Sequence, residues 1–212
     1  MTSLALIAVI GVPAILAISL HEVAHGAVAL KLGDRTAAER GRLSLNPIKH
    51  VDPIGSIAVP AALFFLGKIL FGHPLYFGWA KPVPVVWRHL NPRRLGIGLV
   101  AIAGPMANLL MLLIWFAFAF LLSFTSQAPL FLLVMCEAGI MFNATLMLIN
   151  LIPVPPLDGS RVVTAMLPVQ WALRYNKIEP YGLFVLLLLL TTGGLQWLFG
   201  GVIGVLLDAL PA

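Results

Sequence analysis

The stretch HEVAHGAVALKLGD, residues 21–34, places two histidines and a glutamate directly after twenty residues without a charge, MTSLALIAVIGVPAILAISL. A helix of about 20 mostly apolar residues is long enough to cross a lipid bilayer. Ionisable side chains inside such a helix are energetically costly and usually serve a function. The stretch therefore predicts a membrane-spanning helix that carries a functional polar cluster near its end.

The whole chain has the composition of an integral membrane protein. Of its 212 residues, 60% are hydrophobic and 10% are charged, whereas soluble domains carry roughly 25% charged residues. The net charge of +5 does not indicate nucleic-acid binding, because the basic residues lie between apolar segments, where they set orientation. The single cysteine excludes an internal disulfide. We expect one membrane-embedded domain over residues 1–212, in contact with the lipid bilayer of the cell membrane and without a nucleic-acid partner.

Apolar runs predict an all-α polytopic fold with five or six transmembrane helices. Three of them fall at residues 2–30, 95–124 and 129–151. Residues 54–71 form a shorter candidate that contains Lys68, and residues 180–210 form a helical hairpin or one long span that is interrupted at TTGG. Basic residues gather in three places, the loop at residues 31–53, the segment before Leu95 and the loop after Leu151, which the positive-inside rule assigns to the cytoplasm. The uncharged link SFTSQAP is expected outside. The amino terminus is then expected outside.

Residues 73–87, HPLYFGWAKPVPVVW, have to bring the chain back to the cytoplasmic side after the helix at 54–71. Their alternating prolines forbid a regular helix. Extended chain rises about 3.3 Å per residue, so a dozen residues reach deep into a core about 30 Å thick. Such backbone needs protein or a water-filled cavity around it. We expect a short re-entrant extended, β-like segment near residues 75–87, and a loop on the membrane surface is the alternative.

HEVAH predicts a metal site. In a helix His21 and His25 project from one face, so both imidazoles can reach one metal ion, and Glu22 beside them can hold the metal-bound water. This is the HExxH pattern of zinc proteases. The alternative, histidines that only pack against neighbouring helices, is disfavoured by the apolar surroundings. We expect one Zn²⁺ per chain and a catalytic role for Glu22.

Zinc needs a third protein ligand and an open position for water. The segment NLIPVPPLDGS, residues 150–160, follows the cytoplasmic end of a predicted span, and HEVAH lies near the same leaflet. This shared depth in the membrane favours Asp158 as the third ligand. Aspartate before glycine is also ordinary turn chemistry, and aspartate before a helix is an ordinary N-cap. The other acidic and histidine candidates are Glu137, Asp208, His50, His73 and His89.

These motifs resemble those of the site-2 protease family of intramembrane zinc metallopeptidases. The resemblance also includes GDRTAAERGRLSLNPIKHVDPIGS, FGWAKPVPV and AGPMANLLM, and it covers most of the chain up to about residue 165. No PDZ module or other soluble insertion is present, so the chain resembles a short form of that family. The resemblance implies that His21, His25 and Asp158 bind zinc and that Glu22 is the catalytic acid/base.

Further residues are candidates for contact with substrate. By the resemblance, Asn150 helps to hold the substrate or the oxyanion, and Asn108 lies in a GxxxN-type motif whose first residue is Gly104. Packing of helices through a small residue is the alternative for that pair. The KPVPV segment, with Lys81, Val83 and Val85, is expected to offer a strand edge to an unwound substrate. The simplest interpretation of three further polar residues is a structural role: His50, Asp52 and Glu137.

The expected function is regulated intramembrane proteolysis, the hydrolysis of a peptide bond in or near the membrane segment of a single-span protein, close to the cytoplasmic leaflet. A zinc transporter or metal-binding membrane protein is the main alternative, although it needs no acid/base glutamate beside the first ligand. A catalytically silent scaffold would be expected to lose one of the four motif residues, and all four are present. The oligomeric state is left open by the sequence.

Overall fold

The computed structural model describes residues 3–72, 75, 78–125 and 127–210 of the chain. Within them the chain folds into helices, and no β-strand is found in that part. The α-helices are α1 (Ser3–Lys31), α2 (Thr36–Glu39), α3 (Val59–Phe71), α4 (Arg93–Leu122), α5 (Leu130–Asn150), α6 (Asp158–Met166), α7 (Val169–Asn176), α8 (Glu179–Thr191) and α9 (Gly194–Asp208). Three short helical turns complete them: η1 (Pro47–His50), η2 (Pro53–Ala58) and η3 (Trp87–His89). The predicted all-α fold is confirmed.

Four helical segments among the described residues are long and apolar enough to cross a membrane: Val9–Lys31, Pro53–Phe71, Arg93–Leu122 and Leu130–Asn150. Helices α8 and α9 meet at a bend of 65°, and as one broken span they raise the number to five. The bend falls at the TTGG sequence, where Gly193 has a φ of 74°. Glycine accepts this left-handed conformation without a steric penalty, so the chain turns there.

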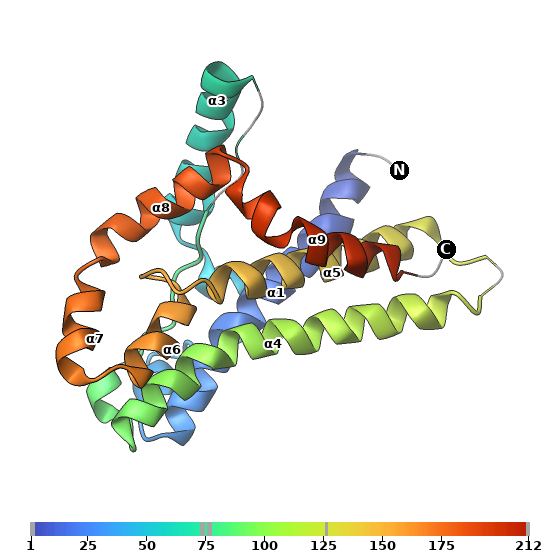
Figure 1. The fold of residues 1–212 in the computed structure, drawn as a ribbon. Helices are drawn as coiled ribbons and strands as arrows, with labels where there is room; N and C mark the ends of the chain where they lie inside the picture. Colours follow the sequence, from blue (N-terminus) through green and yellow to red (C-terminus); the bar gives the residue numbers. More distant parts are fainter. Residues whose placement is uncertain (1–2, 73–74, 76–77, 126, 211–212) are drawn as a thin grey trace.

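Helices α1, α4 and α5 pack against one another and form the centre of the molecule (Figure 1). Helices α4 and α5 share an apolar cluster, whose buried residues include Leu112, Trp115 and Ile140. Gly139 lies under the indole of Trp115, where a Cβ atom would collide with the ring. Small residues of this kind let two membrane helices approach closely. Helix α6 lies against α4, which brings the start of α6 to the bundle.

Helix α3 stands away from this bundle in Figure 1. Only 11% of the apolar window in Pro53–Phe71, which combines η2 and α3, is buried, against 39% for the windows in α1 and α4. Its side chains Phe65, Ile69 and Leu70 are exposed. In a membrane these side chains are available to lipid.

Residues 78–86 follow an irregular path along α1 and are neither helix nor strand. Their backbone is held by the rest of the chain: the Trp79 N–H donates to the Gly55 carbonyl at 3.0 Å, and the Lys81 N–H to the His50 carbonyl at 2.8 Å. The expectation of non-helical chain around the prolines agrees with this path, whereas a β-strand is not found here. The depth of the segment in the membrane stays a prediction. Residues 73, 74, 76 and 77 lie outside the described residues.

Candidate metal centre

Helix α1 places the two histidines of HEVAH side by side. The Nε2 atoms of His21 and His25 are 3.0 Å apart, and the ring planes are nearly perpendicular, at 84°. Only 9% and 12% of the two side chains is exposed. The spacing of four residues thus gives the shared helix face that the sequence predicts.

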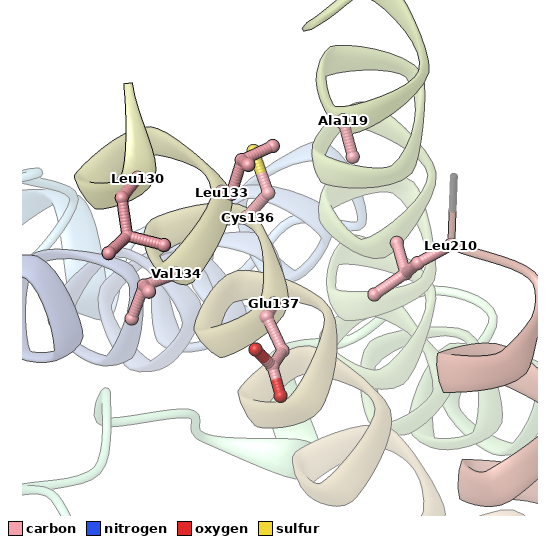
Figure 2. Close-up of a pocket in the computed structure, with 7 residues that line it drawn as sticks. All are labelled: Ala119, Leu130, Leu133, Val134, Cys136, Glu137 and Leu210. Carbon is pink, nitrogen blue, oxygen red and sulfur yellow. The ribbon is translucent and has the colours of Figure 1, made fainter. Parts of the chain in front are cut away.

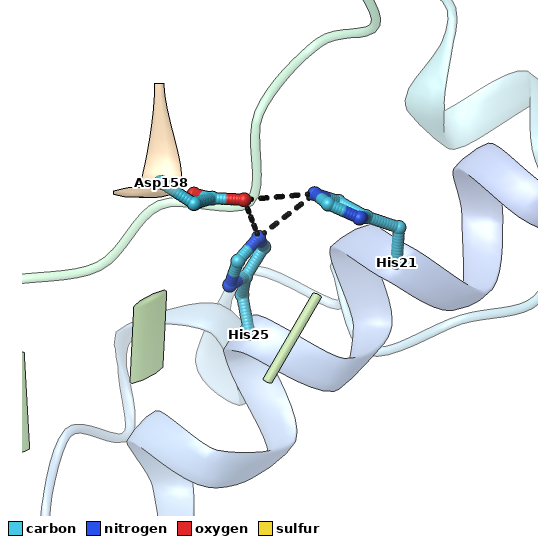
Figure 3. A group of neighbouring side chains, drawn as sticks. All are labelled: His21, His25 and Asp158. Carbon is cyan, nitrogen blue, oxygen red and sulfur yellow. Dashed lines mark hydrogen bonds and ion pairs between the residues drawn. The ribbon is translucent and has the colours of Figure 1, made fainter. Parts of the chain in front are cut away.

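Asp158, the first residue of α6, completes the group (Figure 3). Its Oδ2 atom lies 3.2 Å from His21 Nε2 and 3.3 Å from His25 Nε2. The proline-rich loop between α5 and α6 folds back over Gly159, where a Cβ atom would lie 2.6 Å from the carbonyl carbon of Leu151. Glycine after the aspartate is therefore required for this approach. The structure brings the three predicted metal ligands together.

Hydrogen bonds fix which nitrogen of each imidazole carries the proton. His25 Nδ1 lies 2.7 Å from the Val100 carbonyl, which can only accept, so Nδ1 donates, and in the neutral imidazole Nε2 holds a lone pair. His21 Nδ1 lies 2.6 Å from Asn108 Oδ1. The amide nitrogen of Asn108 donates to the Ala17 carbonyl, so its oxygen faces His21 and accepts from Nδ1. These assignments follow from the partners, and they leave both Nε2 atoms free to bind a metal.

Three lone-pair atoms therefore face one another at 3.0–3.3 Å. Asp158 Oδ2 is buried and has no hydrogen-bond partner. Such atoms repel unless a proton or a metal ion lies between them. A tetrahedral zinc ion with bonds of about 2.0–2.2 Å sets its ligand atoms about 3.3–3.6 Å apart, close to the separations found here. The three side chains therefore fit the ligand set of a zinc ion.

Gly104 of α4 lies directly against the two imidazoles. A Cβ atom at this position would collide with His25 Nε2 and lie 2.6 Å from His21 Cε1. Asn108, one turn further along the same helix, is fully buried and bonds to His21. Both residues of the GxxxN-type motif therefore touch the ligand side chains, in addition to packing α4 against α1.

Glu22 lies beside residues 78–86, the extended segment. The Val83 N–H donates to Glu22 Oε2 at 2.7 Å. Val83 is buried and its side chain lies against Gly26 of α1, while Val85 packs against the apolar cluster of Ala29 and Val100. The Val83 N–H, which the sequence predicts as part of an edge for a substrate, is thus bonded to the carboxylate of Glu22.

Asp34, the last residue of the opening stretch, holds the far end of this segment. It is fully buried and accepts hydrogen bonds from the Val86 N–H at 2.6 Å and from Thr36, and it contacts His89 at 3.2 Å. Burial raises the pKa of Asp34, but the bonds from the Thr36 side chain, the Val86 and Thr36 N–H groups and His89 outweigh it, so the pKa is lower than usual. Asp34 and Glu22 together fix the segment to α1 by its backbone.

Two predicted substrate residues lie apart from the metal ligands. The Asn150 amide donates to the Leu146 carbonyl of its own helix at 3.0 Å, and no described contact joins it to the ligand group. The Lys81 side chain is exposed. Their roles stay predictions.

The other candidates for a third ligand lie elsewhere. Glu137 is exposed in an apolar pocket formed by α4, α5 and the end of the chain (Figure 2). Asp208 is exposed at the end of α9, His50 bonds to the Ser44 carbonyl, and His89 bonds to Asp34. His73 lies outside the described residues. Asp52, expected to be structural, caps η2 by accepting from the Ile54 and Gly55 N–H groups.

Asn143 of α5 is a polar residue at the site that the sequence interpretation missed. It is fully buried, and its side-chain oxygen lies 3.0 Å from the Asn108 amide nitrogen. The signal was an amide within an otherwise apolar span, in FNATLM. It was weaker than HEVAH because an uncharged amide is less costly in a membrane than an ionisable group.

The relatives of the chain are named as putative zinc metalloproteases. The chain is 39% identical over 186 residues to "Putative zinc metalloprotease YwhC" of Bacillus subtilis, covering 84% of this chain and 78% of that protein. It is 30% identical over 199 residues to "Putative zinc metalloprotease Rip2" of Mycobacterium tuberculosis, covering 92% and 71%. It is 27% identical over 190 residues to the Rip2 of Mycolicibacterium smegmatis, covering 87% and 68%. No protein-family model and no solved structure matches the chain.

Proposed function

We propose, from the premise that the chain belongs to the zinc metalloprotease family of YwhC and Rip2, that it is an intramembrane endopeptidase of the site-2 protease type. It would hydrolyse a peptide bond in or near the membrane segment of a single-span, membrane-tethered protein. One observation carries the proposal: His21, His25 and Asp158 converge in a bundle of helices that are long and apolar enough to cross a membrane, with Glu22 next to His21.

The three ligand residues would hold one zinc ion. When bound, zinc would supply a Lewis acid that polarises the scissile carbonyl and lowers the pKa of a water toward neutrality. The protein holds its ligands in place for this ion, because the Val100 carbonyl and the Asn108 amide orient the two imidazoles.

Glu22 would act as the general acid/base. Its carboxylate takes a proton from the attacking water and returns it to the amine that leaves. Support comes from its position next to His21 on α1 and from its partial burial, which limits competition from bulk water. Asn150 is proposed to assist the oxyanion or the substrate backbone.

The extended segment would receive the substrate. A helix in lipid hides its carbonyls in internal hydrogen bonds, so hydrolysis requires a few unwound residues that need new partners. Pro82 and Pro84 carry no N–H, and the Lys81 N–H is bonded to the His50 carbonyl, so a paired strand has to use the N–H groups of Val83 and Val85. A substrate carbonyl could then accept from the Val83 N–H in place of Glu22, which would leave Glu22 to act on water.

Cleavage would occur near the cytoplasmic leaflet. Helix α1 ends at Lys31, six residues after His25, which is roughly 9 Å of helix. Arg35 and Arg40 follow that end, and Arg93 and Arg94 begin α4 near α6. By the positive-inside rule this end of the bundle faces the cytoplasm.

The test uses the full chain in liposomes with a co-reconstituted single-span membrane protein. Wild type and Glu22→Gln are compared for cleavage and for bound zinc, with His25→Ala as the variant that loses zinc. We expect Glu22→Gln to keep zinc and to lose cleavage. Full cleavage by Glu22→Gln with zinc bound would refute the assignment, and zinc flux without cleavage would favour a transporter.

A further inference from the structure

Asn143 lies in the middle of α5, the helix that contributes no ligand to the candidate metal site. It is one of the largest fully buried polar side chains of the part of the chain that is described. Its amide nitrogen donates to the Gly139 carbonyl at 2.7 Å, and its oxygen accepts from the Asn108 nitrogen at 3.0 Å. Two asparagines therefore connect α5 to α4 inside the bundle.

The direction of every bond in this connection is fixed. The Gly139 carbonyl can only accept, so the Asn143 amide presents its nitrogen there and its oxygen to Asn108. Asn108 faces two acceptors, the Asn143 oxygen and the Ala17 carbonyl at 3.2 Å, so its nitrogen turns to both and its oxygen turns to His21. His21 must then carry its proton on Nδ1.

This proton position decides whether His21 can bind a metal. With the proton on Nδ1, the Nε2 lone pair points toward Asp158 Oδ2, 3.2 Å away. With Asn108 reversed, its nitrogen would face Nδ1, the imidazole proton would move to Nε2, and the ligand position would be blocked. Without Asn143, only the longer bond to Ala17 opposes that reversal.

We propose that Asn143 is a positioning residue of the metal site, which acts through Asn108 to hold His21 in its metal-binding tautomer. The inference rests on the metal site of the proposed function and is independent of peptide hydrolysis. The competing explanation is that the asparagine pair only joins two membrane helices, as polar side chains in membranes do. Zinc affinity separates the two, because a helix-joining role does not depend on the proton of His21.

The first experiment measures the zinc dissociation constant of the purified full chain in detergent, by competition with a chelator. We expect Asn143→Leu to weaken zinc binding about 10- to 100-fold, the usual effect of losing a partner behind a ligand. Asn143→Asp should bind zinc more tightly than Asn143→Leu, because a carboxyl group in either protonation state keeps an oxygen that accepts from Asn108. Ile140→Val, which removes a buried methyl group one turn away on α5, should leave zinc affinity unchanged.

The second experiment is a double-mutant cycle of Asn108→Ala and Asn143→Ala. If Asn143 acts through Asn108, its replacement causes no further loss of zinc affinity once Asn108 is absent. Additive losses would overturn the proposal. So would an Asn143→Leu protein that melts at a lower temperature without zinc but binds zinc as wild type does, or an Asn143→Asp protein as weak as Asn143→Leu. A wild-type chain that binds no zinc would overturn the metal site itself.

Discussion

The backbone N–H of Val83 donates to the carboxylate of Glu22 at 2.7 Å, across 61 residues of sequence. Glutamine at position 22 keeps an oxygen that can accept this bond, whereas alanine leaves a buried N–H without an acceptor, at a cost of about 1–3 kcal/mol. We expect Glu22→Gln to unfold with nearly the wild-type free energy and Glu22→Ala to be less stable by about that amount. Denaturant unfolding in detergent measures both, and equal stabilities would contradict the bond.

Gly104 provides a test of how closely α4 approaches the metal ligands. A methyl group there would occupy the space of both imidazoles, so we expect Gly104→Ala to weaken zinc binding at least about 10-fold. Gly11→Ala is the matched control, because a Cβ atom at Gly11 of α1 meets nothing within 4 Å. The control should bind zinc as wild type does. Zinc titration of both proteins decides the matter, and wild-type affinity in Gly104→Ala would exclude the close approach.

The helices and the ligand group could be predicted because their signals are local. Apolar runs long enough to cross a bilayer mark α1, α4 and α5 within two residues of their ends. HEVAH needs only the helical period to place His21 and His25 together. Asp158 lies 133 residues after His25, and its motif also describes an ordinary turn. Its prediction as a ligand therefore needed a further argument, that both motifs lie near the same leaflet of the membrane.

The remaining contacts could not be predicted, because they depend on how distant segments meet. Asn108 and Asn143 stand on different helices, and nothing in either helix specifies that their amides face one another. The KPVPV prolines predict a non-helical path, but not that Glu22 would be the acceptor for Val83. Side-chain hydrogen bonds of this kind depend on how each packed helix is rotated about its axis and shifted along it. The periodicity of the sequence alone does not determine either quantity.

Asp34 makes the docking of the extended segment dependent on pH. Since its pKa is lower in the folded chain than its ordinary value of 3.8, it stabilises the fold above that value, and the contribution is lost as pH falls through the folded pKa. We expect Asp34→Asn to melt below wild type at pH 7. The difference should shrink once the pH is below the folded pKa, where wild-type Asp34 is also neutral. Melting curves across pH test this, and a difference that stays constant would contradict it.

Gly182 of α8 tests whether the carboxyl-terminal helices support the metal site, although the recognisable motifs end before them. A Cβ atom at Gly182 would collide with the Pro155 carbonyl, in the loop that delivers Asp158, and Arg161 of α6 bonds to Glu179 of α8 at 3.1 Å. Overpacking of this kind costs typically about 1–3 kcal/mol. We expect Gly182→Ala to lower both stability and zinc affinity, because the loop must move. Gly201→Ala, in open space on α9, should change neither, and equal behaviour of the two variants would mean that α8 does not hold the loop.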